Sequence, residues 1–313
     1  MTVLERFFAG DQAALARIVS HIEDRGESYL ELLSKLYPKA GKAVKIGFTG
    51  PPGAGKSSLV NCVAKLLADQ GRKVGVIAVD PSSPFTGGAL LGDRVRMHDM
   101  PPDGSVYIRS MATRGSTGGL AASTDNITIA YDAFGFDYIL IETVGVGQVE
   151  LDIINTCDAV IVILVPESGD AVQALKAGLM EIADIFAVNK ADRPLSESIV
   201  AELNSVLQMR NESAGWMIPV VPTEAVNDKN IDKLWSKVIK FLEYSHNSGK
   251  FKQHRIEQIR KKIFDILHNR MHDVMLKKLD RVTDLDHIVE EIYERKTDPF
   301  QASTKLFEIS NFD

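Results

Sequence analysis

Residues 45–58 read KIGFTGPPGAGKSS, an apolar run that leads into a glycine-rich turn and then into a helical pattern. They match the phosphate-binding pattern G-x-x-x-x-G-K-[ST]. Glycines let the backbone approach an anion, Lys56 supplies a charge for the β- and γ-phosphates, and the Ser57 hydroxyl is a ligand for Mg²⁺. A chance Gly/Pro turn would not explain the helical spacing of apolar residues from Leu59 to Leu67. We therefore expect phosphate contacts from Gly50, Pro51, Pro52, Gly53, Ala54, Gly55, Lys56, Ser57 and Ser58.

The composition is that of a globular protein, with 45% hydrophobic and 25% charged residues among 313. A net charge of −6 gives no overall attraction to nucleic acid or anionic lipid. Cys62 and Cys157 lie far apart in apolar patterns, so we expect core thiols, both in helices, and no disulfide or zinc site. The first ten residues do not resemble a signal peptide, and the longest apolar run, 159–166, is too short to span a bilayer. We expect a cytoplasmic protein without nucleic-acid or membrane partners.

The chain divides into three predicted parts: an N-terminal helical extension at 1–42, a nucleotide-binding domain at 43–248, and a C-terminal helical segment at 249–313. Short β-branched runs alternate with helical stretches in the central part. Several runs are continuously apolar, which is typical of strands covered on both faces. The sequence predicts an α/β fold, a mostly parallel sheet with flanking helices, with strands at 44–49, 73–79, 105–109, 137–142, 158–165, 184–189 and 217–221.

The C-terminal part reads as charged helix. Segment 250–281 holds ten Lys/Arg and four Asp/Glu, hence a local charge of +6, whereas 282–313 holds three and eight. A basic helix can bind nucleic acid or a membrane surface, but aromatic interleaving is absent and an acidic segment follows. A solvated face or an oligomer contact is therefore favoured, with a seam at Ile256, Ile259, Ile263, Ile266, Met271 and Val274.

Three carboxylates follow the predicted strands near the phosphate loop. Asp80 ends the strand 73–79, Asp93 lies in a glycine-rich stretch, and Glu142 ends the strand 137–142, three residues before Gly145. An acid followed by x-x-Gly is typical of the γ-phosphate sensor of nucleotide switches. Mg²⁺ prefers one or two carboxylates with phosphate oxygens and water, so Ser57 with a subset of these acids suffices. Asp80 and Asp93 are, taken singly, explained as readily by a turn.

Residues 189–192 read NKAD directly after the strand 184–189. The Asp192 carboxylate can accept two hydrogen bonds from guanine that adenine cannot offer, and the Lys190 stem can lie over the ring. A site built around such pairing can reject the wrong base by roughly 10⁴-fold, because a mismatch leaves a buried charge unpaired. After the last strand, we expect a backbone N–H for the base O6 from the segment Thr223, Glu224 and Ala225. The predicted guanine-binding residues are thus Asn189, Lys190, Asp192 and this segment.

Together these motifs resemble the MeaB/ArgK family of P-loop GTPases, the relatives of the methylmalonic aciduria type A protein. The resemblance extends over nearly the whole chain and is carried by segments 49–58, 79–83, 92–97, 108–115, 142–148 and 189–192. It implies a homodimeric GTPase, with GTP/GDP and Mg²⁺ as ligands and the dimer formed through the C-terminal helices. It further implies a chaperone of adenosylcobalamin-dependent methylmalonyl-CoA mutase that gates cofactor loading and protects the enzyme.

The same resemblance assigns residues. Asp80, Asp93 and Glu142 match the family's acidic magnesium positions, and Lys176 matches a mobile loop that signals to the mutase. Two departures stand out. The segment Thr223-Glu224-Ala225 stands where a Ser-Ala pair is usual, and Val149 replaces a Ser that is common after Gln148.

Slow intrinsic hydrolysis is expected because Val146 stands where many GTPases carry a water-orienting Gln. Lys56 and Glu142 are the predicted catalytic groups, with Gln148 a weaker candidate for positioning water. We hypothesise that the partner orders the switches and brings one arginine onto the γ-phosphate, although surface ion pairs explain any one of them equally well. The candidates are Arg94, Arg96, Arg109 and Arg114.

Three alternatives stay open at this stage. A nickel metallochaperone GTPase should show a Cys/His cluster, and Cys62 and Cys157 are distant in sequence with no His pair at ligand spacing outside the helix around His268 and His272. An ATPase or kinase of the ArgK type would need adenine specificity, which Asp192 opposes. The third alternative is a switch GTPase for another acyl-CoA mutase.

Overall fold

The computed structural model describes residues 1–26, 28–80, 104–112, 124–143, 153–166, 178–210, 215–282 and 285–309. Its contacts divide the chain into two compact units, Met1–His254 and Arg255–Asp313. The first unit contains the phosphate loop, the sheet and the N-terminal helices.

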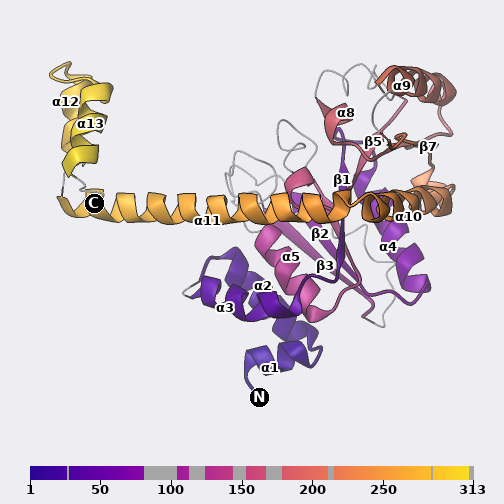
Figure 1. Cartoon of the computed structure of the whole chain (residues 1–313), viewed down its shortest axis with the longest axis horizontal. Coiled ribbons are helices and arrows are strands. Elements are labelled where there is room, and N and C mark those ends of the chain that lie inside the picture. The colour runs from indigo at the N-terminus through magenta and orange to yellow at the C-terminus, as the bar shows by residue number, and fades with distance from the viewer. Residues whose placement is uncertain are drawn as a thin grey trace. The chain divides into compact units, whose positions relative to one another are not determined.

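A seven-stranded sheet forms the centre of the first unit (Figure 1), in the order β3-β2-β4-β1-β5-β6-β7. All of its strand pairs are parallel, which confirms the predicted α/β class. Parallel pairs need crossover connections, and these cover both faces of the sheet with helices. The strands are β1 (Val44–Thr49), β2 (Val74–Asp80), β3 (Val106–Ala112), β4 (Tyr138–Glu142), β5 (Ala159–Leu164), β6 (Ile185–Val188) and β7 (Val220–Pro222).

Two strand boundaries differ from the prediction by three residues, and the others agree to within one residue. The strand predicted at 105–109 continues to Ala112, because β2 pairs with it along its whole length, as far as Asp80 opposite Ala112. The strand predicted at 217–221 begins only at Val220, since its ladder with β6 starts at the pair Phe186 and Val220. Tertiary pairing, which local composition does not report, decides both ends.

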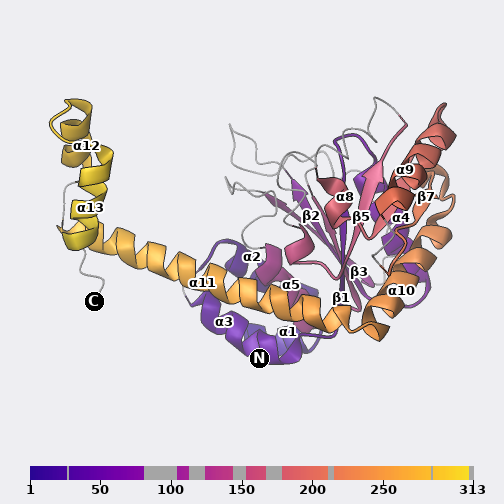
Figure 2. The same cartoon turned by 45° about the horizontal axis from the view of Figure 1, so that its top comes forward.

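Helices cover the two faces in separate layers (Figure 2). One core contains Ile46 and Phe48 of β1 with apolar residues of α4 and α10, and the other contains Ile139 and Ile141 of β4 with residues of α2, α5 and α9. The helices of this unit are α1 (Val3–Phe8), α2 (Gln12–Glu23), α3 (Tyr29–Leu36), α4 (Lys56–Asp69), α5 (Thr124–Phe134), α8 (Leu179–Ile182), α9 (Ser196–Arg210) and α10 (Ile231–Asn247), with short 3₁₀ turns η1 (Tyr37–Lys39), η3 (Ile153–Asn155) and η5 (Ala225–Asn227).

The N-terminal helices share a core with the nucleotide-binding part. Phe7 of α1 is fully buried and its ring lies 5.1 Å from that of Phe134 in α5. The Arg109 guanidinium of β3 forms a 2.7 Å ion pair with Glu23 of α2 and donates to the Ser20 hydroxyl at 3.1 Å. An apolar contact and a polar one therefore hold this segment on the α5 side of the sheet.

The two cysteines are free thiols in different settings. Cys62 lies in α4 as predicted, and its thiol donates to the Ala225 carbonyl at 3.1 Å. Cys157 is buried as expected but lies in the turn before β5, so its prediction as helical is wrong. A helix would not fit there, because the Asp158 N–H donates to the Lys45 carbonyl of β1 at 2.7 Å as β5 begins.

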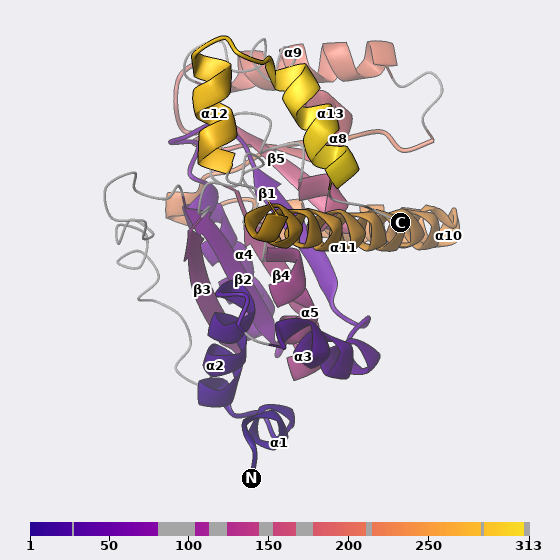
Figure 3. The ribbon, with the colours of Figure 1, turned by 90° about the vertical axis from the view of Figure 1, so that its left-hand side faces the viewer.

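The long helix α11 (Lys250–Val282) begins in the first unit, and most of it belongs to the second, with α12 (Leu285–Tyr293) and α13 (Pro299–Ile309). Figure 3 shows α12 and α13 as a pair of short helices after α11. Large apolar side chains are exposed along α11, among them Ile256, Ile259, Ile263, Phe264, Leu267, Met271 and Val274. Within the described ranges, no helix combines the length and the apolar character needed to cross a bilayer.

Candidate nucleotide site

The phosphate loop joins the carboxyl end of β1 to α4 through glycines in backbone conformations that other residues rarely adopt. The φ angles of Gly50, Gly53 and Gly55 are 142°, 77° and 83°. A Cβ on Gly50 would collide with the Ile163 carbonyl, and one on Gly55 would collide with the Asn189 amide. Only glycine therefore fits at both ends of this loop.

Lys56 and the start of α4 give the loop its positive potential. The Lys56 ammonium donates to the carbonyls of Gly50 at 2.9 Å and Pro51 at 3.1 Å, and the side chain is 7% exposed. The lysine is thus folded back over the loop, which is where the motif places phosphate oxygens. The first N–H groups of α4 have no acceptor within the helix and add a partial positive charge at the same place.

Ser57 and Glu142 meet beside the loop. The Ser57 hydroxyl donates to Glu142 Oε1 at 2.7 Å, and both residues are buried. Glu142 ends β4, and because Ala78 pairs with Glu142, Asp80 lies two residues further along β2 at the same sheet edge. A hydroxyl and a carboxylate oxygen in contact are the hard oxygen ligands that Mg²⁺ takes together with phosphate oxygens and water. The residues present fit that ion.

Asn189 connects the phosphate loop to the loop that follows β7. Its side-chain amide donates to the Ala54 carbonyl at 2.9 Å, and its oxygen accepts from the Ala225 N–H at 3.1 Å and the Thr223 hydroxyl at 3.4 Å. The residue is 2% exposed. The NKAD motif predicts that this asparagine contributes to guanine binding. In the structure its side chain instead connects two loops of the protein by hydrogen bonds.

A cavity of about 200 Å³ lies beside this brace, and Asp192 and Lys190 both line it. Lys190 has a positive φ of 56°, which turns the chain sharply after β6. The predicted lysine and carboxylate of the NKAD motif therefore face one space next to the phosphate loop. The lining residues are Gly55, Ser58, Asn189, Lys190, Asp192, Arg193, Glu224, Ala225, Val226 and Asn227.

The backbone N–H groups of residues 223–225 all donate within the protein. Their acceptors are the Val188 carbonyl, the Lys229 carbonyl and Asn189 Oδ1 respectively. A base oxygen bound at Ala225 would share that N–H with Asn189 or take it over. The contact with the base O6 stays a prediction.

Lys229 is a residue of this site that motif reading missed. Its ammonium forms a 2.6 Å ion pair with Glu224, whose other oxygen accepts from the Asn227 amide at 3.1 Å. The hydrogen bond from Lys229 lowers the pKa of Glu224. Glu224 and Lys229 also form a backbone bridge, so the loop closes on itself. An acid and a lysine five residues apart around a turn are too common to have identified this pair.

The structure brings together the described phosphate-loop residues, Glu142, Asn189, Lys190, Asp192 and Thr223–Ala225 at the carboxyl ends of the strands. It places Arg109, a predicted switch arginine, against α2 through Glu23 and Ser20. Seven predicted residues lie outside the described part of the chain: Asp93, Arg94, Arg96, Arg114, Gly145, Gln148 and Lys176.

The comparisons with known proteins identify the family of the chain. Residues 15–280 match the family model described as "Methylmalonyl Co-A mutase-associated GTPase MeaB". A protein of Pyrococcus abyssi named "Putative GTPase" is 44% identical over 97% of this chain and 94% of its own length. The mouse "Methylmalonic aciduria type A homolog, mitochondrial" is 34% identical over 80% of this chain and 64% of its own length.

A solved structure shares the fold. The crystal structure titled "LAO/AO transport system kinase" is 25% identical and superposes with a TM-score of 0.71, over 98% of this chain and 95% of that one. The family model covers most of the chain, and the relatives that match nearly end to end are named GTPases. The protein is a GTP-hydrolysing enzyme with a P-loop fold, and the chain belongs to the MeaB family of methylmalonyl-CoA mutase-associated GTPases.

Proposed function

We propose that this GTPase is a cytoplasmic chaperone of adenosylcobalamin-dependent methylmalonyl-CoA mutase, which gates loading of the cofactor and protects the loaded enzyme. The family model is described by association with that mutase, and the mouse relative is named after methylmalonic aciduria. Both descriptions refer to methylmalonyl chemistry, and the family match, residues 15–280, includes the nucleotide site.

The observation that carries the switch function is the pair of hydrogen bonds that the Asn189 side chain makes, one with the Ala54 carbonyl and one with the Ala225 N–H. One buried side chain holds the phosphate loop and the loop after β7 at a fixed spacing. Binding of the phosphates at one loop therefore favours binding of the base at the other. Hydrolysis and phosphate release then change contacts within a single connected site. This coupling is what a nucleotide-dependent switch requires.

The site residues are proposed to act as follows. Lys56 lies over the loop to neutralise phosphate charge, and Ser57 with Glu142 would hold Mg²⁺, joined by Asp80 and Asp93. When bound, that ion neutralises charge on the β- and γ-phosphates. Gln148 and one of the switch arginines, Arg94, Arg96, Arg109 or Arg114, are proposed to complete hydrolysis on contact with the partner. Arg109 would first have to leave its ion pair with Glu23 of α2.

Guanine selection is proposed to come from Asp192, which lines the base cavity. Affinity for GTP and ATP should differ strongly in the wild type, and Asp192→Asn should reduce the difference. Xanthosine triphosphate is the complementary probe, because its 2-oxo group suits the asparagine amide. Equal binding of GTP and ATP by the wild type would contradict the assignment.

The C-terminal helices are proposed to form a homodimer. The face of α11 that carries Ile259, Ile263 and Met271 is exposed in the single chain, with exposed fractions of 47%, 53% and 66%. Such a row is typical of a surface that packs on another helix. The Ile259→Glu and Ile263→Glu double variant should be monomeric by light scattering, and a dimer of unchanged stability would refute this.

The client is tested by single-turnover GTP hydrolysis with and without the mutase. We expect a slow rate alone and a much faster rate with the mutase, together with adenosylcobalamin transfer that depends on GTP. A rate that the mutase does not change would refute the proposal, while GTP binding itself would still stand. Replacing the mutase by another acyl-CoA mutase distinguishes the alternative client.

The metallochaperone alternative gains no support from the described residues, which contain no group of three His, Cys, Asp or Glu placed to hold a metal ion. Cys62 is committed to the Ala225 carbonyl, and burial raises the pKa of its thiol to about 12. A thiol held in this way is a poor metal ligand, because metals bind the thiolate.

A further inference from the structure

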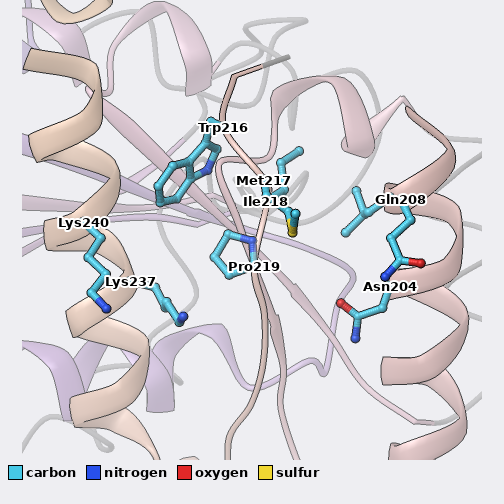
Figure 4. A pocket seen from close by; sticks show the side chains of 9 residues that line it. Asn204, Gln208, Trp216, Met217, Ile218, Pro219, Lys237 and Lys240 are labelled. Atoms are coloured by element: carbon cyan, nitrogen blue, oxygen red, sulfur yellow. The ribbon is translucent and has the colours of Figure 1, made fainter. Parts of the chain in front are cut away.

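A second cavity, of about 340 Å³, lies at the opposite end of the strands from the nucleotide site. Figure 4 shows residues 216–219, the extended chain leading into β7, running between two helices. Lys237 and Lys240 come from α10 on one side, and Asn204 and Gln208 come from α9 on the other. None of these residues lines the nucleotide cavity. We call this cavity the edge groove.

A fixed aromatic ring forms one wall of the edge groove. The Trp216 indole N–H donates to the Asp184 carbonyl at 3.0 Å, at the start of β6. Its ring stacks on Tyr244 at a centroid distance of 5.4 Å and meets the edge of Phe241 at 5.3 Å. The hydrogen bond and the two rings of α10 fix the indole, which presents an apolar surface beside the side chains of Met217 and Pro219.

The groove follows a free sheet edge. β7 is the last strand of the sheet within the described part of the chain. The Pro219 carbonyl accepts from the Phe186 N–H at 2.9 Å, so alternation along the strand directs the N–H and C=O of Val220 away from β6. At the next such position the Pro222 carbonyl already accepts from the Asn230 amide at 2.9 Å. On the outer edge of β7, Val220 can therefore donate one hydrogen bond and accept one, whereas the Pro222 carbonyl is already used.

Charge on the edge groove is of one sign. Lys237 and Lys240 stand one helical turn apart on α10, and neither has an ion-pair partner in the ranges that the structure describes. The facing side chains of Asn204 and Gln208 are uncharged amides that can pair with a peptide backbone. An occupant with carboxylates would complement the lysines without repulsion from the other wall.

We propose that the edge groove binds an extended acidic segment of a partner protein, which adds as a strand to the outer edge of β7. Its backbone pairs with Val220, a carboxylate approaches Lys237 and Lys240, and an apolar side chain packs on Trp216. This mode takes affinity from main-chain hydrogen bonds and specificity from alternate side chains. The site is additional to the nucleotide switch, and it does not depend on which mutase is the client.

A small amphipathic anion would use the lysines and the indole but not the strand edge. A peptide is favoured because the outward N–H and C=O of Val220 and the side-chain amides of Asn204 and Gln208 offer hydrogen bonds over a longer stretch than a small anion can use. The experiment below separates the two classes of ligand.

The full-length protein is titrated with two arrays of immobilised octapeptides. In one array, alternate positions are glutamate and the others are leucine, valine, isoleucine, phenylalanine or tyrosine. In the other array, lysine replaces glutamate. We expect binding to the acidic array and a change in the fluorescence emission of Trp216. The Trp216→Phe variant, which retains only the buried Trp235, gives the emission that does not come from the groove. Equal binding to both arrays, or none to the acidic one, would overturn the proposal.

Two further comparisons test the contacts. The Lys237→Glu and Lys240→Glu double variant should bind the best acidic peptide about tenfold more weakly, whereas Lys35→Glu and Lys39→Glu, on the exposed surface of the N-terminal helices, should not. All variants should bind GTP normally, which shows that they fold. A peptide methylated at alternate backbone nitrogens should lose binding to the unaltered protein. Octanoate binding as tightly as the best peptide, with no effect of methylation, would refute strand addition.

Discussion

Asn189→Ala should separate the two loops of the nucleotide site and destabilise the fold. In the native chain the amide group satisfies the Ala54 carbonyl at 2.9 Å and the Ala225 N–H at 3.1 Å, inside a site where the side chain is 2% exposed. Truncation leaves a buried acceptor and a buried donor without these partners. Each such group costs about 1–3 kcal/mol. For the two groups together, the free energy of unfolding should fall by roughly 2–6 kcal/mol, with the upper end reached only where water does not enter.

Two further variants assign the loss to individual contacts. Asn189→Asp keeps an oxygen for the Ala225 N–H but sets a carboxylate oxygen against the Ala54 carbonyl, so it should cost at least as much as the alanine variant. Thr223→Val removes only the longer 3.4 Å hydrogen bond and should cost under about 1 kcal/mol.

Urea unfolding followed by circular dichroism measures the stabilities, and titration with a fluorescent GDP analogue measures binding. Affinity should fall most in Asn189→Asp, since both loops shift and a negative charge is added near the phosphates. An Asn189→Ala variant within about 0.5 kcal/mol of the wild type would refute the bracing role, as would an Asn189→Asp variant of native stability.

Three other changes have definite expected outcomes. Gly55→Ala should abolish tight nucleotide binding, because it adds backbone strain at φ 83° and a clash with the Asn189 side chain. The control Gly71→Ala, at φ 73° with open space around it, should cost only about 1 kcal/mol of stability and leave nucleotide binding intact. Titration calorimetry with the nucleotide measures the difference in binding. Glu142→Gln keeps an acceptor for Ser57 but loses the charge, so the Mg²⁺ concentration that half-saturates GTP binding should rise about tenfold or more. Burial raises the pKa of Asp184 to about 7, so the folded state holds this proton more tightly than the unfolded chain does. Stability should therefore fall as pH rises from about 4 to about 7, by on the order of 1.4 kcal/mol for each pKa unit, and urea titration of Asp184→Asn should show this slope reduced.

Sequence patterns predicted most of the sheet because its strands are buried on both faces. β5 reads AVIVIL and all six of its residues are buried, so composition alone placed it. β3 was predicted too short because Arg109 and Ser110 interrupt its apolar run. In the structure Arg109 is satisfied by Glu23, far away in the chain, and a polar residue is tolerated in the strand for that reason.

The motifs located the nucleotide site without showing how it is held together. Spacing patterns placed Lys56, Ser57 and Asp192, because each residue type is dictated by the ligand. The ion pair between Glu224 and Lys229 is dictated by the loop itself, and many residue pairs could close that loop equally well. Residues that recognise a ligand are therefore readable from sequence, while residues that support them are found only in the fold.

The edge groove shows the same limit more strongly. Its two lysines, its amides and its indole come from three segments, and each is unremarkable in its own helix or loop. They meet because α9 and α10 lie on opposite faces of the sheet and β7 ends it, so both helices reach past the last strand. The topology that collects nucleotide ligands at the carboxyl ends of the strands thus also leaves one strand edge open between two helices. An open edge carrying only positive charge at its rim resists pairing with a second copy of itself, and it accepts an acidic strand.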